Sequence, residues 1–389
     1  MSMRDQNIKE DSVISRVVSN ELCVGCGMCA ARLPDVLKMN TTSLGEYVPI
    51  VKVDAAEGWG SESLKVCPFS SQAANEDSIG EALYQPIDGI SHRKECGYYL
   101  STYSGYLTDD SARLAATSGG IITWLAKRML ITKKVDAVVC VGASGAKDQL
   151  FEYQFIQDPA DLDRCKKSRY YPVEVSSVIP LIKASEGKVL FIGLPCFIKA
   201  LRLAMDVDPV LKKRIAYTVG LVCGHLKTKK YAAYLARNCG VLEENIHSVD
   251  FRRKIEGRSA HKYAFSVEER TEAGLLRKQV MMDQVWASSW GNNLFMLKAC
   301  ESCDDIFAET ADIVVGDGWL NEFAADYRGT SVILCRTEAM RDLLKEGVEL
   351  GELCINDLGI DRVIESQVGA LRQRRDGLEY RLAVAKQEG

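Results

Sequence analysis

The sequence predicts an α/β protein whose body contains a mostly parallel or mixed sheet, preceded by a small α+β module at the N-terminus. From about residue 101 onward, short apolar runs alternate with helical patterns, and strands separated by helices at this spacing form βαβ units. The first 80 residues lack this alternation and instead carry closely spaced cysteines and glycines. The chain therefore divides into a cysteine-rich module and a larger α/β body.

Each predicted element follows from the spacing of its apolar residues. In residues 120–131, Ile121, Leu125 and Met129 recur every four positions, which indicates a helix. The other predicted helices lie within residues 1–20, 177–184, 197–205, 338–344 and 360–389. The predicted strands of the body cover residues 102–108, 135–141, 188–192, 215–222, 311–315 and 330–336.

We expect four segments along the chain. We expect the cysteine-rich module in residues 1–80 and a C-terminal helical extension in residues 346–389. Between them, residues 81–185 and 186–345 form the two parts of the body.

The composition excludes several classes of protein. The net charge of the 389 residues is −4, which gives no indication of nucleic-acid binding. No apolar run approaches the roughly 20 residues of a membrane-spanning helix, and the N-terminus has no signal-peptide pattern. Fourteen cysteines without a secretory signal indicate a reducing compartment, so we expect a cytoplasmic protein with metal or redox chemistry.

The most informative motif is C-x2-C-x2-C at Cys23, Cys26 and Cys29, followed later by Cys67 and Pro68. Iron–sulfur clusters need thiolates that converge from several directions, and a tight loop with this spacing directs three of them inward. The glycines between the cysteines permit positive φ, so that backbone N–H groups can turn toward the sulfur atoms. The fourth thiolate would come from Cys67.

The spacing also predicts how many clusters this module holds. In the bacterial run C-x2-C-x2-C-x3-C-P, the fourth cysteine ligates a second cluster. Here that position is Leu33, followed by Pro34. The positions that would begin a second run before Cys67 hold no thiol either: Glu57, Gly60 and Ser63. We therefore predict a ferredoxin-like module with one 4Fe–4S cluster, with a zinc site or free thiols as alternatives.

A second group of thiols lies in the body. Cys196 and Cys223 each follow a predicted strand, and Cys300 and Cys303 form another C-x2-C pair. Ligand sites in open α/β sheets gather beyond the carboxyl ends of the strands, and four thiolates are the number that a second 4Fe–4S cluster requires. A zinc ion on Cys300, Cys303 and two other ligands remains open, as does simple packing of buried thiols.

The remaining cysteines are expected to pack as small hydrophobic residues. Cys140, Cys239 and Cys335 lie within strand or helix patterns, which favours this interpretation. The sequence pattern does not assign a role to three others, for which packing is the default interpretation: Cys96, Cys165 and Cys354.

A glycine turn at Thr117, Ser118, Gly119 and Gly120 stands at the start of a predicted helix. Hydroxyls there would cap the first turn, and glycines would let a ligand approach the backbone closely. The N–H groups and dipole of the helix suit an anion such as a diphosphate. An ordinary N-cap with a tight turn is the alternative.

These motifs occur in an order that resembles the beta-subunit family of coenzyme F420-reducing hydrogenases and dehydrogenases. The similarity extends over residues 20–345 and is greatest to long members with a fused ferredoxin module, such as 7-hydroxymethyl chlorophyll a reductase and divinyl chlorophyllide reductase. Besides the cysteine motif, the stretches that carry it are T-S-G-G-I-I-T-W-L, V-D-A-V-V-C-V, F-I-G-L-P-C-F-I-K-A-L, G-L-V-C-G-H, F-R-R-K and C-E-S-C-D-D-I-F-A-E-T-A-D-I-V-V-G-D.

The resemblance implies a flavin-containing iron–sulfur oxidoreductase. In that family FAD binds in the α/β body, where the turn from Thr117 to Gly120 would contribute, and the body cluster uses thiols that match Cys196, Cys223, Cys300 and Cys303. Arg252 and Asp317 are candidate pocket residues, although either could instead hold a loop through a salt bridge. Two histidines are candidate proton donors. His225 could instead cap the helix that begins near Thr228, and His261, which lies in a strand-like run, could instead be structural.

We expect electrons to pass from ferredoxin, or a similar protein donor, through two 4Fe–4S clusters to FAD and then to an organic substrate. In the reverse direction, reduced coenzyme F420 would feed electrons through FAD and the clusters to a partner enzyme. A non-catalytic electron-transfer subunit and a zinc protein without redox function are further alternatives. The oligomeric state stays open, and a homo-oligomer is compatible with the sequence.

Overall fold

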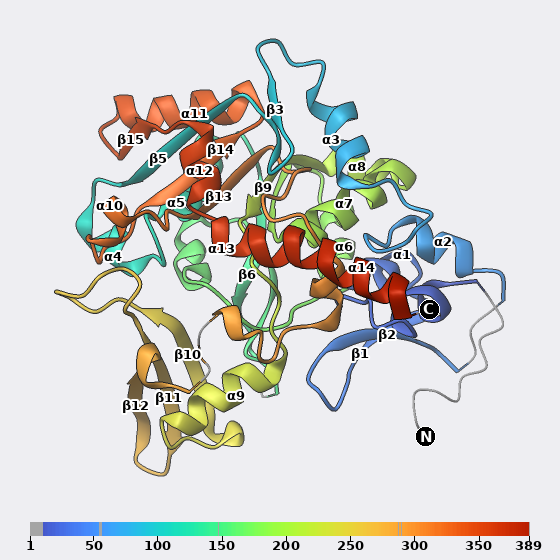
Figure 1. Cartoon of the computed structure of the whole chain (residues 1–389), viewed down its shortest axis with the longest axis horizontal. Helices are drawn as coiled ribbons and strands as arrows, with labels where there is room; N and C mark the ends of the chain where they lie inside the picture. The colour runs from blue at the N-terminus through green and yellow to red at the C-terminus, as the bar shows by residue number, and fades with distance from the viewer. Residues whose placement is uncertain (1–10, 54–56, 147, 287, 289, 389) are drawn as a thin grey trace.

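The computed structural model describes residues 11–53, 57–146, 148–286, 288 and 290–388. Their centre is an eight-stranded sheet with the order β15-β5-β14-β13-β9-β8-β6-β7 (Figure 1). The four inner strands β13, β9, β8 and β6 run parallel, and the outer pairs are antiparallel, so the sheet is mixed. The strands are β5 (Ser101–Leu107), β6 (Ala137–Ala143), β7 (Phe151–Ile156), β8 (Val189–Gly193), β9 (Ile215–Leu221), β13 (Ile313–Asp317), β14 (Ser331–Cys335) and β15 (Leu353–Asp357).

Apolar side chains on both faces explain why the inner strands are buried. All five residues of β8 are buried, as expected for a parallel strand covered on both sides. Leu190 belongs to a core that includes Leu125 and Leu343, whereas its neighbour Phe191 belongs to the opposite core with Leu201. The helices that supply these residues are α5 (Ile121–Ile131), α11 (Glu338–Glu349) and α7 (Pro195–Val207).

The N-terminal module packs against the body at the right of Figure 1. It contains a hairpin, β1 (Leu37–Thr41) with β2 (Tyr47–Val51), and two short helices, α1 (Met28–Arg32) and α2 (Gly60–Lys65). Both helices contact α7, and the backbone N–H of Val175 in the body donates to the carbonyl of Cys26 at 2.9 Å. The module is therefore docked on the body by direct contacts.

A separate antiparallel sheet lies at the lower left of Figure 1 and packs against α9 (Lys229–Asn238). It consists of β10 (Ile246–Arg253), β11 (Ala264–Thr271) and β12 (Gly274–Met281). The smaller elements are α3 (Glu76–Tyr84), β3 (Ser91–Arg93), β4 (Gly97–Tyr99), α4 (Asp110–Ala115), α6 (Ile179–Ala184), α8 (Pro209–Arg214) and α10 (Asn321–Ala324).

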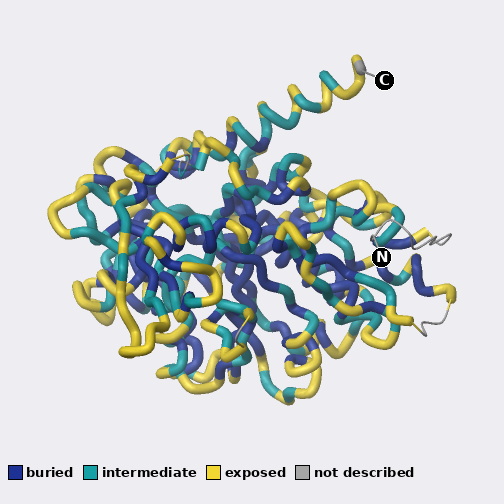
Figure 2. The backbone as a smooth tube through the Cα atoms, turned by 90° about the horizontal axis from the view of Figure 1, so that it is seen from below, coloured by how far each residue is buried: buried dark blue, intermediate teal, exposed yellow. Residues whose placement is uncertain are grey.

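All six strands predicted for the body are confirmed, with small shifts of their ends. The predicted leading helix is reduced to one turn at Ile14–Val18, and residues 1–10 lie outside the described residues. The C-terminal helix is interrupted. It consists of α12 (Ile360–Glu365), α13 (Val368–Leu371), a π-turn at Arg372–Asp376 and α14 (Gly377–Glu388), whose end extends away from the body (Figure 2).

Among the described residues, no helix combines the length and the apolar character needed to cross a membrane.

Candidate functional site

The main cavity lies beyond the carboxyl ends of the parallel strands and has a volume of about 280 Å³. Residues that end or follow β8, β9 and β13 line it, among them Leu194, Cys223 and Asp317. Its opposite walls come from the start of α5 and from a loop that contains Trp290. This is the position where open α/β sheets bind ligands.

The predicted glycine turn forms one wall of this cavity, to which Thr117, Ser118 and Gly120 contribute. Gly120 precedes α5 with φ of +87°, a conformation that favours glycine. A Cβ atom on Gly119 would lie 2.4 Å from the carbonyl oxygen of Gly105, so this close approach also requires glycine.

The hydroxyls of the turn do not cap α5, and that part of the prediction is wrong. Ser118 Oγ donates to the carbonyl of Thr330 at 2.8 Å, and Thr117 Oγ1 accepts from the backbone N–H of Ser168 at 2.7 Å. Both hydroxyls therefore fix the turn to neighbouring loops, which leaves the first N–H groups of α5 without a side-chain cap.

A basic segment that sequence reasoning missed also lines the cavity beside the turn: Lys166, Lys167, Ser168 and Arg169. Lys167 has φ of +81° and pairs with Asp250 at 3.2 Å. The Nε of Arg169 is buried and has no hydrogen-bond partner among the described residues. The run K-K-S-R was visible in the sequence, but only the fold brings it beside the glycine turn.

His225 lies in the cavity wall and is 4% exposed. Its ring stacks on Trp290 with centroids 4.3 Å apart, and neither ring nitrogen has a partner in the described part of the chain. Burial lowers its pKa to about 2, and the positive charges of Lys227 and Arg374 add to this shift. The imidazole is therefore neutral, and it does not cap α9, which begins after Thr228.

His261 lies elsewhere. It is exposed, stacks on Trp319 at 4.8 Å, and precedes β11 instead of lying in it, so the predicted strand position is wrong. It is not among the residues that line the main cavity.

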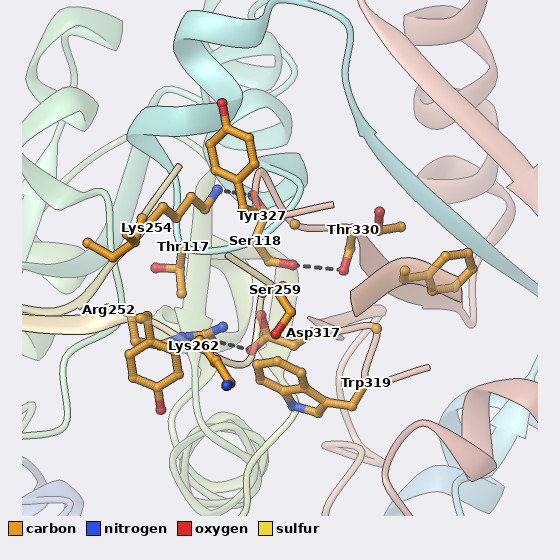
Figure 3. Close-up of a pocket in the computed structure, with 16 residues that line it drawn as sticks. Thr117, Ser118, Arg252, Lys254, Ser259, Lys262, Asp317, Trp319, Tyr327 and Thr330 are labelled. Atoms are coloured by element: carbon orange, nitrogen blue, oxygen red, sulfur yellow. Dashed lines mark hydrogen bonds and ion pairs between the residues drawn. The ribbon is translucent and has the colours of Figure 1, made fainter. Parts of the chain in front are cut away.

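Arg252 and Asp317 form an ion pair with each other at 2.5 Å, as the alternative of a loop-holding salt bridge predicts. They lie in a smaller pocket of about 10 Å³ that shares Thr117, Ser118 and Asp317 with the main cavity (Figure 3). In the same pocket Lys254 donates to the carbonyl of Ser118 at 2.9 Å, which adds a second support for the glycine turn.

The four N-terminal thiols meet as predicted, around a small cavity of about 20 Å³: Cys23, Cys26, Cys29 and Cys67. Burial raises the pKa of Cys23 to about 12 and that of Cys67 to about 11. Gly25 has φ of +69°, the positive φ that the sequence predicted for this glycine, and its N–H points to Cys23 Sγ at 3.4 Å.

The second group of thiols also comes together, from three separate segments. Cys196 lies in the first turn of α7, Cys223 follows β9, and Cys300 and Cys303 lie in and after a 3-10 turn at Lys298–Ser302. Burial, followed by the charges of the other three thiols, raises the pKa of Cys196. The backbone N–H of Leu226 donates to Cys300 Sγ at 3.3 Å.

In the described residues, no three side chains of Cys, His, Asp or Glu converge closely enough to hold a single metal ion. This geometry gives no support to the zinc alternative, because zinc needs its ligands around one centre. In a 4Fe–4S cluster each thiolate binds its own iron, so the four thiols stand farther apart.

Arg374 is a second component that sequence reasoning missed. It lies in the π-turn and is 2% exposed. Its guanidinium donates to the carbonyl of Cys303 at 2.5 Å and to the carbonyl of Gly224. Burial raises the pKa values of three body thiols, and the charge of Arg374 opposes that rise at each of them: Cys223, Cys300 and Cys303. The arginine-rich C-terminus indicated only a solvated helix, so no local pattern predicted this contact.

The two thiol groups and the main cavity are neighbours. Cys26 of the first group and Cys196 of the second are close enough for their charges to interact, and both act on the buried phenol of Tyr153. Tyr153 and Cys223 line the main cavity. The three sites therefore follow one another from the N-terminal module into the body.

Comparison with known proteins identifies the fold. Residues 102–180 match the N-terminal part, and residues 186–359 the C-terminal part, of the coenzyme F420 hydrogenase/dehydrogenase beta subunit. The chain belongs to this family. The N-terminal module and the segment with Arg374 lie outside the two matched ranges.

Two relatives agree with this assignment. The chain is 25% identical over 392 aligned residues to the coenzyme F420-dependent sulfite reductase of Methanocaldococcus jannaschii, with 94% of this chain covered. It spans about half of that protein's length, 53%. A chain of the F420-reducing [NiFe] hydrogenase complex from Methanosarcina barkeri has a similar fold, with a TM-score of 0.56 and 18% identity. That similarity covers 75% of this chain and 95% of the other.

Proposed function

We propose that this beta-subunit family member is a flavin- and iron–sulfur-dependent oxidoreductase that connects coenzyme F420 with a protein electron carrier. The observation that carries the proposal is the row of three adjoining sites, in which two groups of four thiols lead to a cavity at the strand ends. The family, and a relative named for its dependence on coenzyme F420, support the choice of this coenzyme.

The residues that line the main cavity support the proposal that FAD binds there. The glycine turn and the basic segment with Lys167 and Arg169 offer N–H groups and positive charge to a diphosphate, and the buried Nε of Arg169 has no hydrogen-bond partner among the described residues. The stacked rings of His225 and Trp290 offer a flat apolar surface. A flavin bound there can accept an electron pair from an organic molecule and release electrons one at a time.

The two thiol groups suit 4Fe–4S clusters. Each supplies four cysteines from more than one segment, and neither has the geometry of a single-ion site. We assign the first cluster to Cys23, Cys26, Cys29 and Cys67, and the second to Cys196, Cys223, Cys300 and Cys303.

The family relation favours coenzyme F420 as the small-molecule partner. Ferredoxin, or a similar carrier, would exchange electrons at the N-terminal module, where Cys23 and Cys67 are only half-buried. This exposure also favours a second candidate function, in which ferredoxin supplies electrons and an organic substrate accepts them at the flavin.

The test begins with anaerobic purification and with counts of iron, acid-labile sulfide and flavin. We expect about eight irons and one FAD per chain. Rapid mixing with reduced coenzyme F420 should then bleach the flavin absorbance, followed by the absorbance of the clusters. Bleaching by reduced ferredoxin alone would favour the second candidate function, and a protein without flavin would refute both.

A cysteine variant tests the assignment of the second cluster. Cys300→Ser should remove about half of the iron and leave the N-terminal cluster intact. Cys239→Ser is the matched control, because this thiol ends α9 and does not line the main cavity. Unchanged iron in the Cys300 variant would show that the assignment is wrong.

A further inference from the structure

Two cysteines that the proposed function does not use lie against each other in the wall of the main cavity. Cys140 is a buried residue of β6, and Cys165 ends a 3-10 turn at Pro159–Cys165. Both residues line the cavity, and the neighbouring Cys165 thiol, followed by burial, raises the pKa of Cys140.

The fold leaves room for both sulfur atoms on one face of β6. Residues 140 and 142 of this strand project to the same side. A Cβ atom on Gly142 would lie only 3.0 Å from Cys165 Sγ, so the glycine provides the space that this thiol occupies. The Cys165 thiol also donates to Gln154 Oε1 at 3.7 Å, on the neighbouring strand β7. These contacts hold Cys165 directly over β6.

The two thiols differ in reactivity. Cys165 is half-buried, whereas Cys140 is buried. The neighbouring Cys140 thiol lowers the pKa of Cys165, and the positive charges of Arg169 and Arg164 act in the same direction against the effect of burial. A thiol that is accessible, close to cations and beside a second thiol has the features of an attacking cysteine with its resolving partner.

We propose that Cys140 and Cys165 form a redox-active dithiol that reacts with small organic disulfides and closes to an intramolecular disulfide. The Cys165 thiolate attacks one sulfur of the disulfide, which forms a mixed disulfide and releases one thiolate. Cys140 loses its proton and attacks Cys165 Sγ, so the protein disulfide forms and the second thiolate leaves. The protein gives up two electrons and two protons, and the small disulfide becomes two thiols.

Closure of this bond would affect the neighbouring basic segment, because Lys166 directly follows Cys165. The bond would fix the end of the 3-10 turn to β6 and thereby hold one wall of the cavity. The chemistry requires neither the flavin nor the clusters, so this inference goes beyond the proposed function and can be tested independently of it.

The experiment uses the full chain, purified and reduced without oxygen. After incubation with glutathione disulfide, free thiols are alkylated and the peptides are mapped by mass spectrometry. We expect a peptide that links Cys140 to Cys165, formed at lower glutathione disulfide concentration than any other disulfide in the chain. If both cysteines remain fully alkylated while other thiols react, the proposal is wrong.

Two variants separate the roles of the cysteines. Cys140→Ala removes the resolving thiol, so Cys165 should accumulate as a mixed disulfide with glutathione. Cys165→Ala should abolish both products at this site, and Cys239→Ala should leave the linked peptide unchanged. A Cys140 variant in which Cys165 stays unmodified would contradict the assignment of the attacking thiol, and the mapping of the wild-type protein stands even if a variant fails to fold.

Discussion

Replacing Arg374 with Gln should lower the reduction potential of the body cluster that we propose, and leave the N-terminal cluster unchanged. The guanidinium is buried, and its charge interacts with all four body thiols. The N-terminal thiols are not among the main groups that shift its pKa. Reduction adds one negative charge to the cluster, and a nearby fixed positive charge favours that step. Without this charge, the body cluster is harder to reduce.

The expected shift follows from the size of one charge interaction. A unit charge about 4–7 Å from another contributes about 2.4–4 kcal/mol at an effective dielectric constant near 20. Since about 1.4 kcal/mol corresponds to about 59 mV for a one-electron couple, the potential should fall by about 100–180 mV. The loss of the hydrogen bonds to Cys303 and Gly224 acts on the same loops and should also reduce the stability of the cluster.

The assay is a redox titration followed by electron paramagnetic resonance, with the N-terminal cluster as the internal reference. Arg374→Lys keeps the charge and should recover most of the shift. Arg381→Gln is the matched control, because Arg381 binds the same loop through the carbonyl of Glu301 at 2.6 Å but is not among the main charges that shift the pKa values of the body thiols. A shift below about 30 mV in Arg374→Gln, or an equal shift in the Arg381 variant, would refute the reasoning.

Three further predictions concern the walls of the cavity. Gly119→Ala should destabilise the protein by about 1–3 kcal/mol in thermal unfolding and reduce its flavin content, because the new Cβ would meet a backbone carbonyl at 2.4 Å. Gly145→Ala is the control and should change neither stability nor flavin content, because nothing lies within 4 Å of its Cβ position. Asp317→Ala should lower the free energy of unfolding by about 2–3 kcal/mol in chemical denaturation, because it leaves the buried Arg252 without its partner. The loss should stay below the about 3–5 kcal/mol of a fully buried pair, because Asp317 is 24% exposed. A loss below about 1 kcal/mol would contradict this reasoning. Burial, followed by neighbouring cations, lowers the pKa of Lys254 to about 7. Between pH 7 and 9 the unfolded state therefore holds a proton that the folded state lacks, and the free energy of unfolding should rise with pH. Lys254→Met should flatten that rise, and an unchanged pH profile would count against the lowered pKa.

The sequence predicted those features that depend on neighbours along the chain. Apolar runs identified the inner strands, since both faces of a parallel sheet are covered and each strand is apolar throughout. The cysteine motifs at residues 23–29 and 300–303 identified five of the eight clustered thiols. Positions at strand ends identified Cys196 and Cys223, and the Cys-Pro pair identified Cys67. In each case a few adjacent residues contain the pattern.

The features that were missed depend on contacts between distant segments. Strand β12 was not predicted because most of its residues are exposed, and β15 was not predicted because it ends in two exposed polar residues. The basic segment at Lys166 acquires its position only when the chain folds it against Thr117. Arg374 reaches Cys303 across 71 positions of sequence, and no local periodicity can indicate such a contact.

The parts outside the two family ranges converge on the body thiols, which supports the electron path that we propose. The N-terminal module is tied to the body through the bond from Val175 to Cys26, beside Cys196. The C-terminal segment places Arg374 between the loops of Cys223 and Cys303. A tethered ferredoxin would need no such contacts, because a mobile domain can deliver electrons by collision. Fixed contacts are needed when the distance between two centres must stay constant, and this chain has them on both sides of the second thiol group.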